Sequence, residues 1–330
     1  MILRPDILAL LLSSLLVSLM TLGAAGFGVV VLRRWDIGSG SELQLALERR
    51  TYLVTTLMGY LLLFQLASLF LFIRSADDMS RLFAGAMCAV GTLSANPYGY
   101  PALLVKIATF ILALLWLILN RADSRGYDYP LIRPKYILLL VIAPLVLAET
   151  LLLWRYFLGL KPDIITSCCG ALFSSRSRGV AADLAALPPV PVAAAFSACT
   201  VIVILAGARF RLSGKWGYLL ALSSAVQFPL ALSSIISFVS IYIYELPSHH
   251  CPFCLLQKEY GYLGYPLYAL LLCAAVSGVG VGMLQRFRPR ESLAEVIPSM
   301  QRQLALISLL CNLLFTVLVL WRIYSSSLNL

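Results

Sequence analysis

The residues most suited to chemistry lie together at positions 249–254, which read His-His-Cys-Pro-Phe-Cys. This segment holds the only two histidines of the chain and its only Cys-x-x-Cys motif. Cysteines at this spacing can form a disulfide, exchange it with another thiol, or bind a metal ion. Thiolates and imidazoles suit Zn²⁺ or Cu(I), so the metal hypothesis takes His249, His250, Cys251 and Cys254 as ligands. The simpler interpretation of the two histidines is a pair of solvated loop residues.

A second pair of cysteines, Cys168 and Cys169, is adjacent in the sequence. A trans peptide holds neighbouring Cα atoms ~3.8 Å apart, below the ~4.4–6.8 Å usual across a disulfide. We therefore expect these thiols to pair with other cysteines or to bind a soft metal together. Cys88 is either a packing residue or a third partner for this chemistry. Three further cysteines, which fall within apolar runs, are expected to pack as small hydrophobes: Cys199, Cys273 and Cys311.

The rest of the chain indicates that these cysteines are positioned by membrane helices. Of the 330 residues, 61% are hydrophobic and 12% are charged, and the mean hydropathy is +0.90. A soluble domain has about 25% charged residues, and a transmembrane barrel has alternating rather than continuous apolar runs. Runs long enough to cross a ~30 Å hydrocarbon core predict an all-α polytopic membrane protein with about eight transmembrane helices. The predicted spans are 8–32, 52–73, 101–120, 136–158, 191–208, 217–243, 264–284 and 303–322.

The distribution of basic residues predicts which loops face the cytoplasm. Four alternate connections hold fifteen of the 25 basic residues: Arg33, Arg34, Arg49, Arg50, Arg121, Arg125, Arg133, Lys135, Arg209, Arg211, Lys215, Arg286, Arg288, Arg290 and Arg302. By the positive-inside rule these connections are cytoplasmic, and both termini lie outside. The loops 74–100, 159–190 and 244–263, which hold five of the eight cysteines, are then also outside. We expect a bacterial inner membrane with the cysteine cluster on its oxidising, periplasmic side. The first apolar run is longer than the apolar core of a signal peptide. This favours a first transmembrane helix that stays in the protein over a signal peptide that is cleaved.

Similar segments recur at a nearly constant offset. Leu-Trp-Arg occurs at 153–155 and again at 320–322, and Gly-Tyr-Pro follows Cys88 and Cys254 by about a dozen residues each time. This pattern predicts two tandem parallel four-helix units. The first covers 1–165 and the second 191–330, and an outer loop at 166–190 carries Cys168 and Cys169. Proline in the first turn and tyrosine at headgroup level explain Gly-Tyr-Pro as a helix start.

Two ionisable residues are expected inside the membrane, where charge is costly. Lys106 and Glu149 fall at similar depths in the third and fourth predicted spans. They form an ion pair in one interpretation, and a proton or quinone-headgroup site in the other. Three polar residues within spans are expected to bond between helices: Gln65, Gln227 and Asn312.

The arrangement of cysteines at a helix mouth and on an outer loop resembles that of disulfide-forming quinone reductases and vitamin K epoxide reductases. That resemblance implies thiol-disulfide exchange coupled to a quinone, with Cys251, Cys254, Cys168 and Cys169 as reacting residues. The doubled length, the paired histidines and the adjacency of Cys168 and Cys169 depart from the pattern of those families.

Two alternatives remain open from the sequence. The first is binding of copper or zinc, with an outer thiol protein or metallochaperone as partner. Cys168 and Cys169 are similar to the first acceptor pair of mercury importers, but the cytoplasmic loops lack a second thiol pair to receive the ion. The second is a structural membrane subunit with disulfide-stapled loops. The basic residues are explained by the inner leaflet of the bilayer rather than by nucleic acid.

Overall fold

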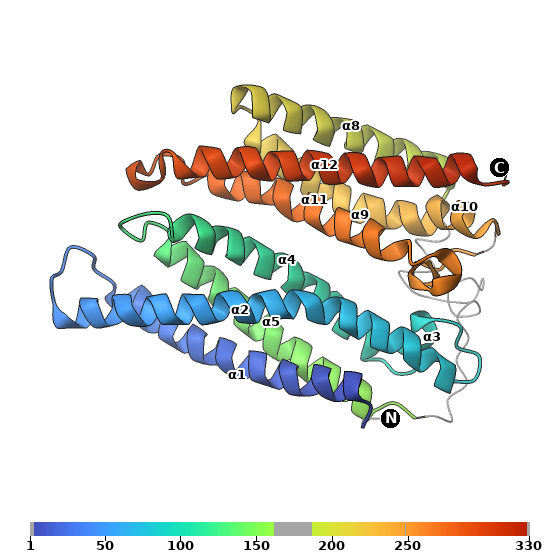
Figure 1. Ribbon diagram of the computed structural model, residues 1–330, viewed down its shortest axis with the longest axis horizontal. Coiled ribbons are helices and arrows are strands. Elements are labelled where there is room, and N and C mark those ends of the chain that lie inside the picture. Colours follow the sequence, from blue (N-terminus) through green and yellow to red (C-terminus); the bar gives the residue numbers. More distant parts are fainter. Residues whose placement is uncertain (1–2, 162–186, 248, 329–330) are drawn as a thin grey trace. The chain divides into compact units, whose positions relative to one another are not determined.

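The computed structural model describes residues 3–161, 187–247 and 249–328, and within these ranges the chain is helical and has no strand (Figure 1). Eight helices in these ranges are long and apolar enough to cross a membrane. They are α1 (Pro5–Arg34), α2 (Glu42–Met79), α4 (Gly99–Asp123), α5 (Ile132–Leu158), α8 (Pro189–Ser213), α9 (Gly217–Ser234) continuing to residue 244, α11 (Gly264–Gln285) and α12 (Val296–Ser325). The predicted all-α polytopic membrane protein is confirmed.

All eight helices extend beyond their predicted apolar spans, and α2 and α12 begin furthest ahead of theirs. Helix α2 begins at Glu42 rather than at residue 52, because the Ser41 side chain caps it by accepting a hydrogen bond from the Gln44 amide at 3.3 Å. Arg49 and Arg50 therefore lie in a helix and not in a loop. A helix can continue into the headgroup region, whereas hydropathy detects only the part within hydrocarbon.

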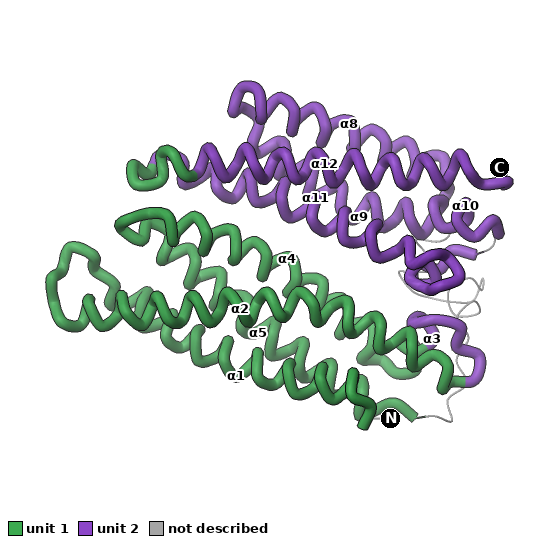
Figure 2. Tube along the Cα trace, in the orientation of Figure 1, with its two compact units in different colours: residues 1–83, 92–164, 290–296 green, residues 84–91, 165–289, 297–330 purple. Residues whose placement is uncertain are grey.

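The chain forms two compact units, which Figure 2 distinguishes by colour. Unit 1 comprises residues 1–83, 92–164 and 290–296, and unit 2 comprises 84–91, 165–289 and 297–330. The short segment 84–91 thus belongs with the second half of the chain. It ends within the short helix α3 (Ala89–Leu93) and brings Cys88 into unit 2.

Unit 1 is built from four long helices. Helix α1 packs against α2 and α5, and α4 packs against the same two helices. Their shared core contains Trp116 and Tyr136, both completely buried, and the Trp116 indole N–H donates to the Lys135 carbonyl at 3.1 Å. Gly28 of α1 allows this packing, since an added Cβ there would lie 2.8 Å from the Tyr136 ring.

In unit 2, α9 packs against both α8 and α11. Ser308 of α12 donates to the Ala274 carbonyl of α11 at 3.1 Å. Gly278 lets α9 and α11 approach closely, because a Cβ at that position would lie 2.0 Å from the Ser224 hydroxyl. Helix α9 continues through a π-helical turn, η2 (Ile235–Val239), into α10 (Ser240–Tyr244).

Both Gly-Tyr-Pro segments begin helices as predicted, α4 at Gly99 and α11 at Gly264. Each glycine also allows a close approach. An added Cβ would lie 2.3 Å from the Leu93 carbonyl oxygen at Gly99, and 3.0 Å from the Leu255 carbonyl carbon at Gly264. In both places a short helical turn packs on the start of a long helix, and that turn begins directly after Cys88 in one case and at Cys254 in the other. The tandem duplication itself stays a prediction.

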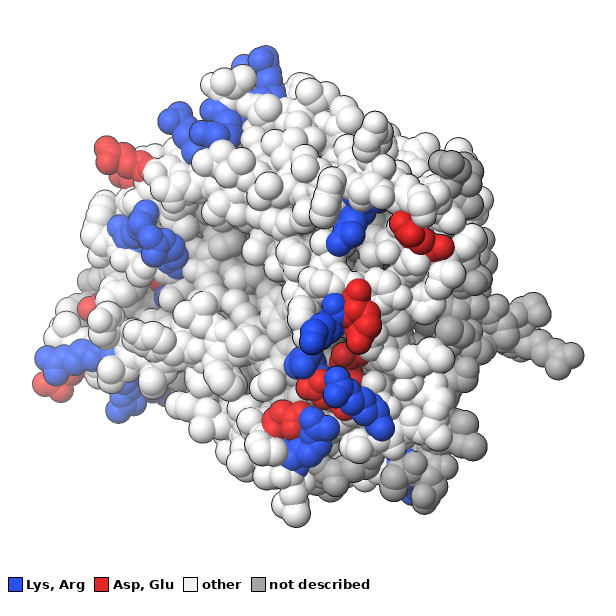
Figure 3. Space-filling model, turned by 45° about the vertical axis from the view of Figure 1, so that its right-hand side comes forward, with Lys and Arg blue, Asp and Glu red and all other residues white. Residues whose placement is uncertain are grey.

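The visible surface agrees with a protein placed in a bilayer. On the face that Figure 3 shows, most of the surface is neither acidic nor basic, and the charged side chains gather in separate groups. Many large apolar side chains on the long helices are exposed, for example Leu12, Leu104 and Leu222 at 63–65%. Such exposure is ordinary against lipid and costly in water.

Candidate functional site

Three cysteine sulfurs converge in unit 2. The Sγ atoms of Cys88, Cys251 and Cys254 all lie within 4.8 Å of one another, and the Cys88 and Cys251 sulfurs are 3.4 Å apart. The three residues are 0%, 2% and 5% exposed, respectively. The sequence left Cys88 either as a packing residue or as a third partner, and the structure brings it to the other two.

The segments that carry these cysteines are short turns rather than long helices. Cys88 directly precedes α3, and Cys254 is the first residue of the 3₁₀ turn η3 (Cys254–Leu256). A second 3₁₀ turn, η4 (Lys258–Tyr260), follows before α11 begins at Gly264. The Cys-x-x-Cys motif therefore does not itself begin a long helix. The stabilisation of a thiolate described below comes from local contacts of the loop.

Hydrogen bonds hold this loop in place. The Tyr244 hydroxyl donates to the Cys251 carbonyl at 2.5 Å, and the Tyr268 hydroxyl donates to the Pro252 carbonyl at 2.6 Å. The Gln257 side-chain amide donates to the Met87 carbonyl at 2.8 Å, which ties the loop to the segment of Cys88. Three side chains thus hold the backbone of the Cys-x-x-Cys motif and that of the residue before Cys88.

The walls around the sulfurs are apolar and aromatic. The three cysteines belong to one buried core cluster whose members come from α8, the α9–α10 helix, α11 and α12. Large members of this cluster are Phe196, Tyr244, Leu255, Leu267, Leu271 and Phe315. Tyr244 and Tyr260 also pack edge to face, with ring centroids 4.6 Å apart. The site is therefore shielded from bulk water, which strengthens the electrostatic effect of each nearby group.

The contacts between thiols distinguish the individual cysteines. Hydrogen bonds from the thiols of Cys254 and Cys88 lower the pKa of the Cys251 thiol well below its ordinary value, although burial acts in the opposite direction. Hydrogen bonds with the thiols of Cys251 and Cys88, together with burial, raise the pKa of Cys254. Cys251 is thus the sulfur on which a thiolate is stabilised, and a thiolate is the reactive form of cysteine.

The two histidines lie next to this site but are not part of the sulfur group. The His250 Nδ1–H donates to the Ile236 carbonyl of the π-helical turn at 2.9 Å. The His249 ring packs edge to face on Tyr244, with centroids 4.4 Å apart, and burial lowers the pKa of His249. Among the described residues, the group with mutually close ligand atoms contains three sulfurs and no imidazole. Metal ligation by His249 and His250 stays a prediction.

The remaining predicted reacting residues, Cys168 and Cys169, lie outside the described residues. Of the cysteines expected to pack within spans, Cys199 is buried and its thiol lies 3.6 Å from the Ser223 carbonyl. Cys273 is exposed on α11, and Cys311 is partly exposed on α12.

The predicted membrane-embedded charges meet in unit 1. The Lys106 ammonium lies 2.6 Å from Glu149 Oε1, which also accepts a hydrogen bond from the Gln65 amide at 2.6 Å. The Thr109 hydroxyl donates to the other oxygen, Oε2, at 2.5 Å. The ion pair and the interhelical role of Gln65 are confirmed, while cofactor binding by Lys106 and Glu149 stays a prediction.

The two other polar residues predicted to bond between helices differ in their partners. Gln227 of α9 donates to Thr200 of α8 at 2.6 Å, as expected of a bond between helices. Asn312 donates instead to the Ser308 carbonyl of its own helix α12 at 2.9 Å, so the interhelical prediction for Asn312 is wrong. Within a helix, a side chain four residues on can reach that carbonyl without a partner helix.

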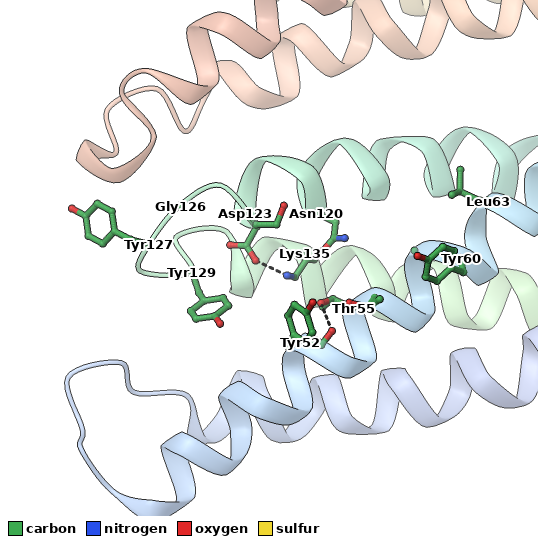
Figure 4. Close-up of a pocket in the computed structure, with 13 residues that line it drawn as sticks. Tyr52, Thr55, Tyr60, Leu63, Asn120, Asp123, Gly126, Tyr127, Tyr129 and Lys135 are labelled. Atoms are coloured by element: carbon green, nitrogen blue, oxygen red, sulfur yellow. Dashed lines mark hydrogen bonds and ion pairs between the residues drawn. The ribbon is translucent and has the colours of Figure 1, made fainter.

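Unit 1 also has a cavity of about 640 Å³, which Figure 4 shows. It is lined in part by Tyr52, Tyr60, Tyr127 and Tyr129 and by a buried ion pair between Asp123 and Lys135. The sequence placed Lys135 in a cytoplasmic loop, whereas it lies in the first turn of α5 and is 2% exposed. The lining contains no cysteine or histidine. Among the described residues, the cysteines whose sulfurs lie close together all belong to unit 2.

Comparison with protein-family models, with curated proteins and with solved structures gives no match to this chain. Its function is therefore interpreted from the geometry of the site. The structure supports an integral membrane protein with a buried cluster of three cysteines.

Proposed function

We propose that this chain performs thiol-disulfide exchange and passes the electrons to a membrane carrier of the quinone class. The observation that carries this proposal is the mutual proximity of the Cys88, Cys251 and Cys254 sulfurs. Exchange needs a thiolate close to a disulfide whose leaving sulfur is also near. Three sulfurs within 4.8 Å meet that need without any residue from elsewhere.

Cys251 is the central sulfur in this scheme. It is 3.4 Å from the Cys88 sulfur and is joined to Cys254 by the Cys-x-x-Cys spacing, so it can bond to either one. A disulfide between Cys251 and Cys254 is attacked by the Cys88 sulfur, which gives up its proton. The sulfur bond then joins Cys88 to Cys251, and Cys254 leaves and takes up that proton, since its raised pKa favours the thiol. No net oxidation accompanies this internal step.

Net electron transfer begins with an outer protein dithiol, which reduces a disulfide of the site and is itself oxidised to a disulfide. A quinone then accepts two electrons and two protons from two thiols of the site, which restores the disulfide and gives a quinol. Because the three sulfurs are buried, we propose that Cys168 and Cys169 relay exchange between the outer partner and the site. The oxidising side of the bacterial inner membrane suits this chemistry. Lys106 and Glu149 stay in the proposal as a quinone-headgroup or proton site.

Mapping of disulfides in the purified protein tests the internal exchange. After oxidation by a soluble quinone analogue, mass spectrometry of alkylated peptides should find Cys251 bonded to Cys254 or to Cys88. Cys254→Ser should retain the bond between Cys88 and Cys251, and Cys251→Ser should lose both bonds. Cys273→Ser, a change at an exposed cysteine of α11, is the matched control and should leave the pattern unchanged. Thiols at all three positions that persist after quinone treatment would contradict the proposal.

A further inference from the structure

The three-sulfur group has the composition of a site for a soft metal ion. Cys88, Cys251 and Cys254 present their sulfurs from two segments that are far apart in the sequence. Thiolates select soft ions such as Cu(I), whereas carboxylates and carbonyls suit hard ions such as Mg²⁺ or Ca²⁺. Within the described chain, the group of mutually close ligand atoms contains sulfur alone.

The number of ligands separates copper from zinc. Zinc is usually four-coordinate in proteins, with four protein ligands in structural sites and three plus a water in catalytic sites, whereas the described cluster offers three sulfurs in a buried setting. At a metal-sulfur distance of ~2.3 Å, three sulfurs that surround an ion in one plane lie ~4.0 Å apart. The observed separations, 3.4 Å for Cys88 and Cys251 and no more than 4.8 Å for the other two pairs, are compatible with that value. Three sulfurs thus match an ion that accepts three soft ligands.

The surroundings hold the sulfurs together before any ion arrives. Tyr244 and Tyr268 fix the carbonyls of Cys251 and Pro252, and Gln257 joins the loop to the Met87 carbonyl. A ligand set that packing and hydrogen bonds preorganise does not have to be gathered when the ion binds. The three cysteines are also buried, and burial protects Cu(I) from hydration and oxidation.

We propose that Cys88, Cys251 and Cys254 bind one Cu(I) ion in a three-sulfur site. The thiols that become ligands release their protons to solvent, and copper remains Cu(I), so no electron is transferred. This ligand set differs from the one predicted from the sequence, because Cys88 takes the place of the histidines. The inference uses the sulfurs of the proposed exchange reaction but does not depend on that reaction.

Competition with a coloured Cu(I) chelator, bicinchoninate, tests the site on the reduced full-length protein in detergent. One Cu(I) per chain should be withdrawn from the chelator. Cys88→Ala should lower the affinity by at least ~100-fold, since loss of a ligand exceeds the ~10–100-fold effect of losing an outer-shell group. Cys273→Ala and the His249→Ala/His250→Ala double variant should bind as the wild type does. Loss of binding in the histidine variant, or a wild type that binds Zn²⁺ but not Cu(I), would overturn the inference.

X-ray absorption of the copper-loaded wild type gives an answer that does not depend on the folding of any variant. We expect scattering from three sulfurs at ~2.3 Å with no nitrogen in the first shell. Nitrogen in that shell would overturn the ligand set. The disulfide mapping is done on metal-free protein, so the two proposals fail separately. Copper binding without quinone-driven disulfides supports only the metal site, and disulfides without copper binding support only the exchange reaction.

Discussion

Two buried clusters, one in each compact unit, differ in what their functional atoms contact. In unit 1, the Glu149 carboxylate meets the Lys106 ammonium, and both of its oxygens accept further hydrogen bonds from Gln65 and Thr109. In unit 2, the sulfurs of Cys88 and Cys251 meet each other, and the Cys254 sulfur lies within 4.8 Å of both. The first cluster pairs opposite charges, whereas the second gathers three groups of the same kind.

This difference separates structural from chemical roles. A buried ion pair is costly to break, because the remaining charge stays in a medium of low polarity. Its atoms are already occupied, so a quinone headgroup would have to displace one of these bonds in order to bind. Three adjacent thiols add little stability, but they can exchange bonds with one another or share an ion. We therefore expect mutations in the first cluster to affect folding, and mutations in the second to affect reactivity.

Glu149→Leu should have the largest effect on stability. It leaves the Lys106 ammonium, which is 2% exposed, without its carboxylate. We expect the free energy of unfolding to fall by about 3–5 kcal/mol. Reversible unfolding of the protein in mixed micelles, followed by circular dichroism, measures the change.

The double variant Lys106→Met/Glu149→Leu is the control for that experiment. It removes both charges and should recover stability to within ~1 kcal/mol of the wild type, because an apolar pair of similar volume replaces the ion pair. If Glu149→Leu alone is as stable as the wild type, the pair is not a structural element of unit 1. A quinone-headgroup site at Lys106 and Glu149 would then be the stronger hypothesis.

The sequence predicts the membrane helices well. Hydropathy measures the free energy of transferring apolar side chains out of water, and the same free energy places these helices in lipid. It does less well where helices continue beyond the hydrocarbon core. The start of α2 at Glu42 depends on the Ser41 cap, and the position of Lys135 inside α5 depends on its ion pair with Asp123. Each depends on a local contact that a window of mean hydropathy does not register.

The site is predictable in part for a similar reason. Cys251 and Cys254 are recognisable from their spacing alone. Cys88 is not, since its contact with Cys251 joins residues 163 positions apart in the sequence. The recurrence of cysteine before Gly-Tyr-Pro is the one signal that relates Cys88 to Cys254. Tyr244 and Tyr268 give no comparable signal, because tyrosines are frequent near the ends of membrane helices.

Cys88→Ala should have a smaller effect on stability and a larger one on chemistry. Removal of one small buried group costs about 1–2 kcal/mol by analogy with other core truncations. The bond between Cys88 and Cys251 can no longer form, so quinone oxidation should yield only the pairing of Cys251 with Cys254. Cys199→Ala, at a buried cysteine of α8, is the matched control and should cost a similar amount without altering the disulfides. A loss of stability comparable to that of Glu149→Leu would remove the contrast between the two clusters.

Tyr268→Phe should have the smallest effect on stability. It removes the hydrogen bond to the Pro252 carbonyl but keeps the ring, and a bond of this kind contributes about 0.5–1.5 kcal/mol. If the Cys251–Cys254 loop opens locally to expose its thiols, that loss raises the open population, and alkylation of Cys254 by a small maleimide should accelerate by roughly 2–10-fold. Tyr262→Phe, at a tyrosine that is 40% exposed in the same loop, should leave the rate unchanged. Equal alkylation rates in the wild type and both variants would mean that the maleimide reaches Cys254 without opening of the loop. The Tyr268 hydroxyl would then not limit access to the sulfurs.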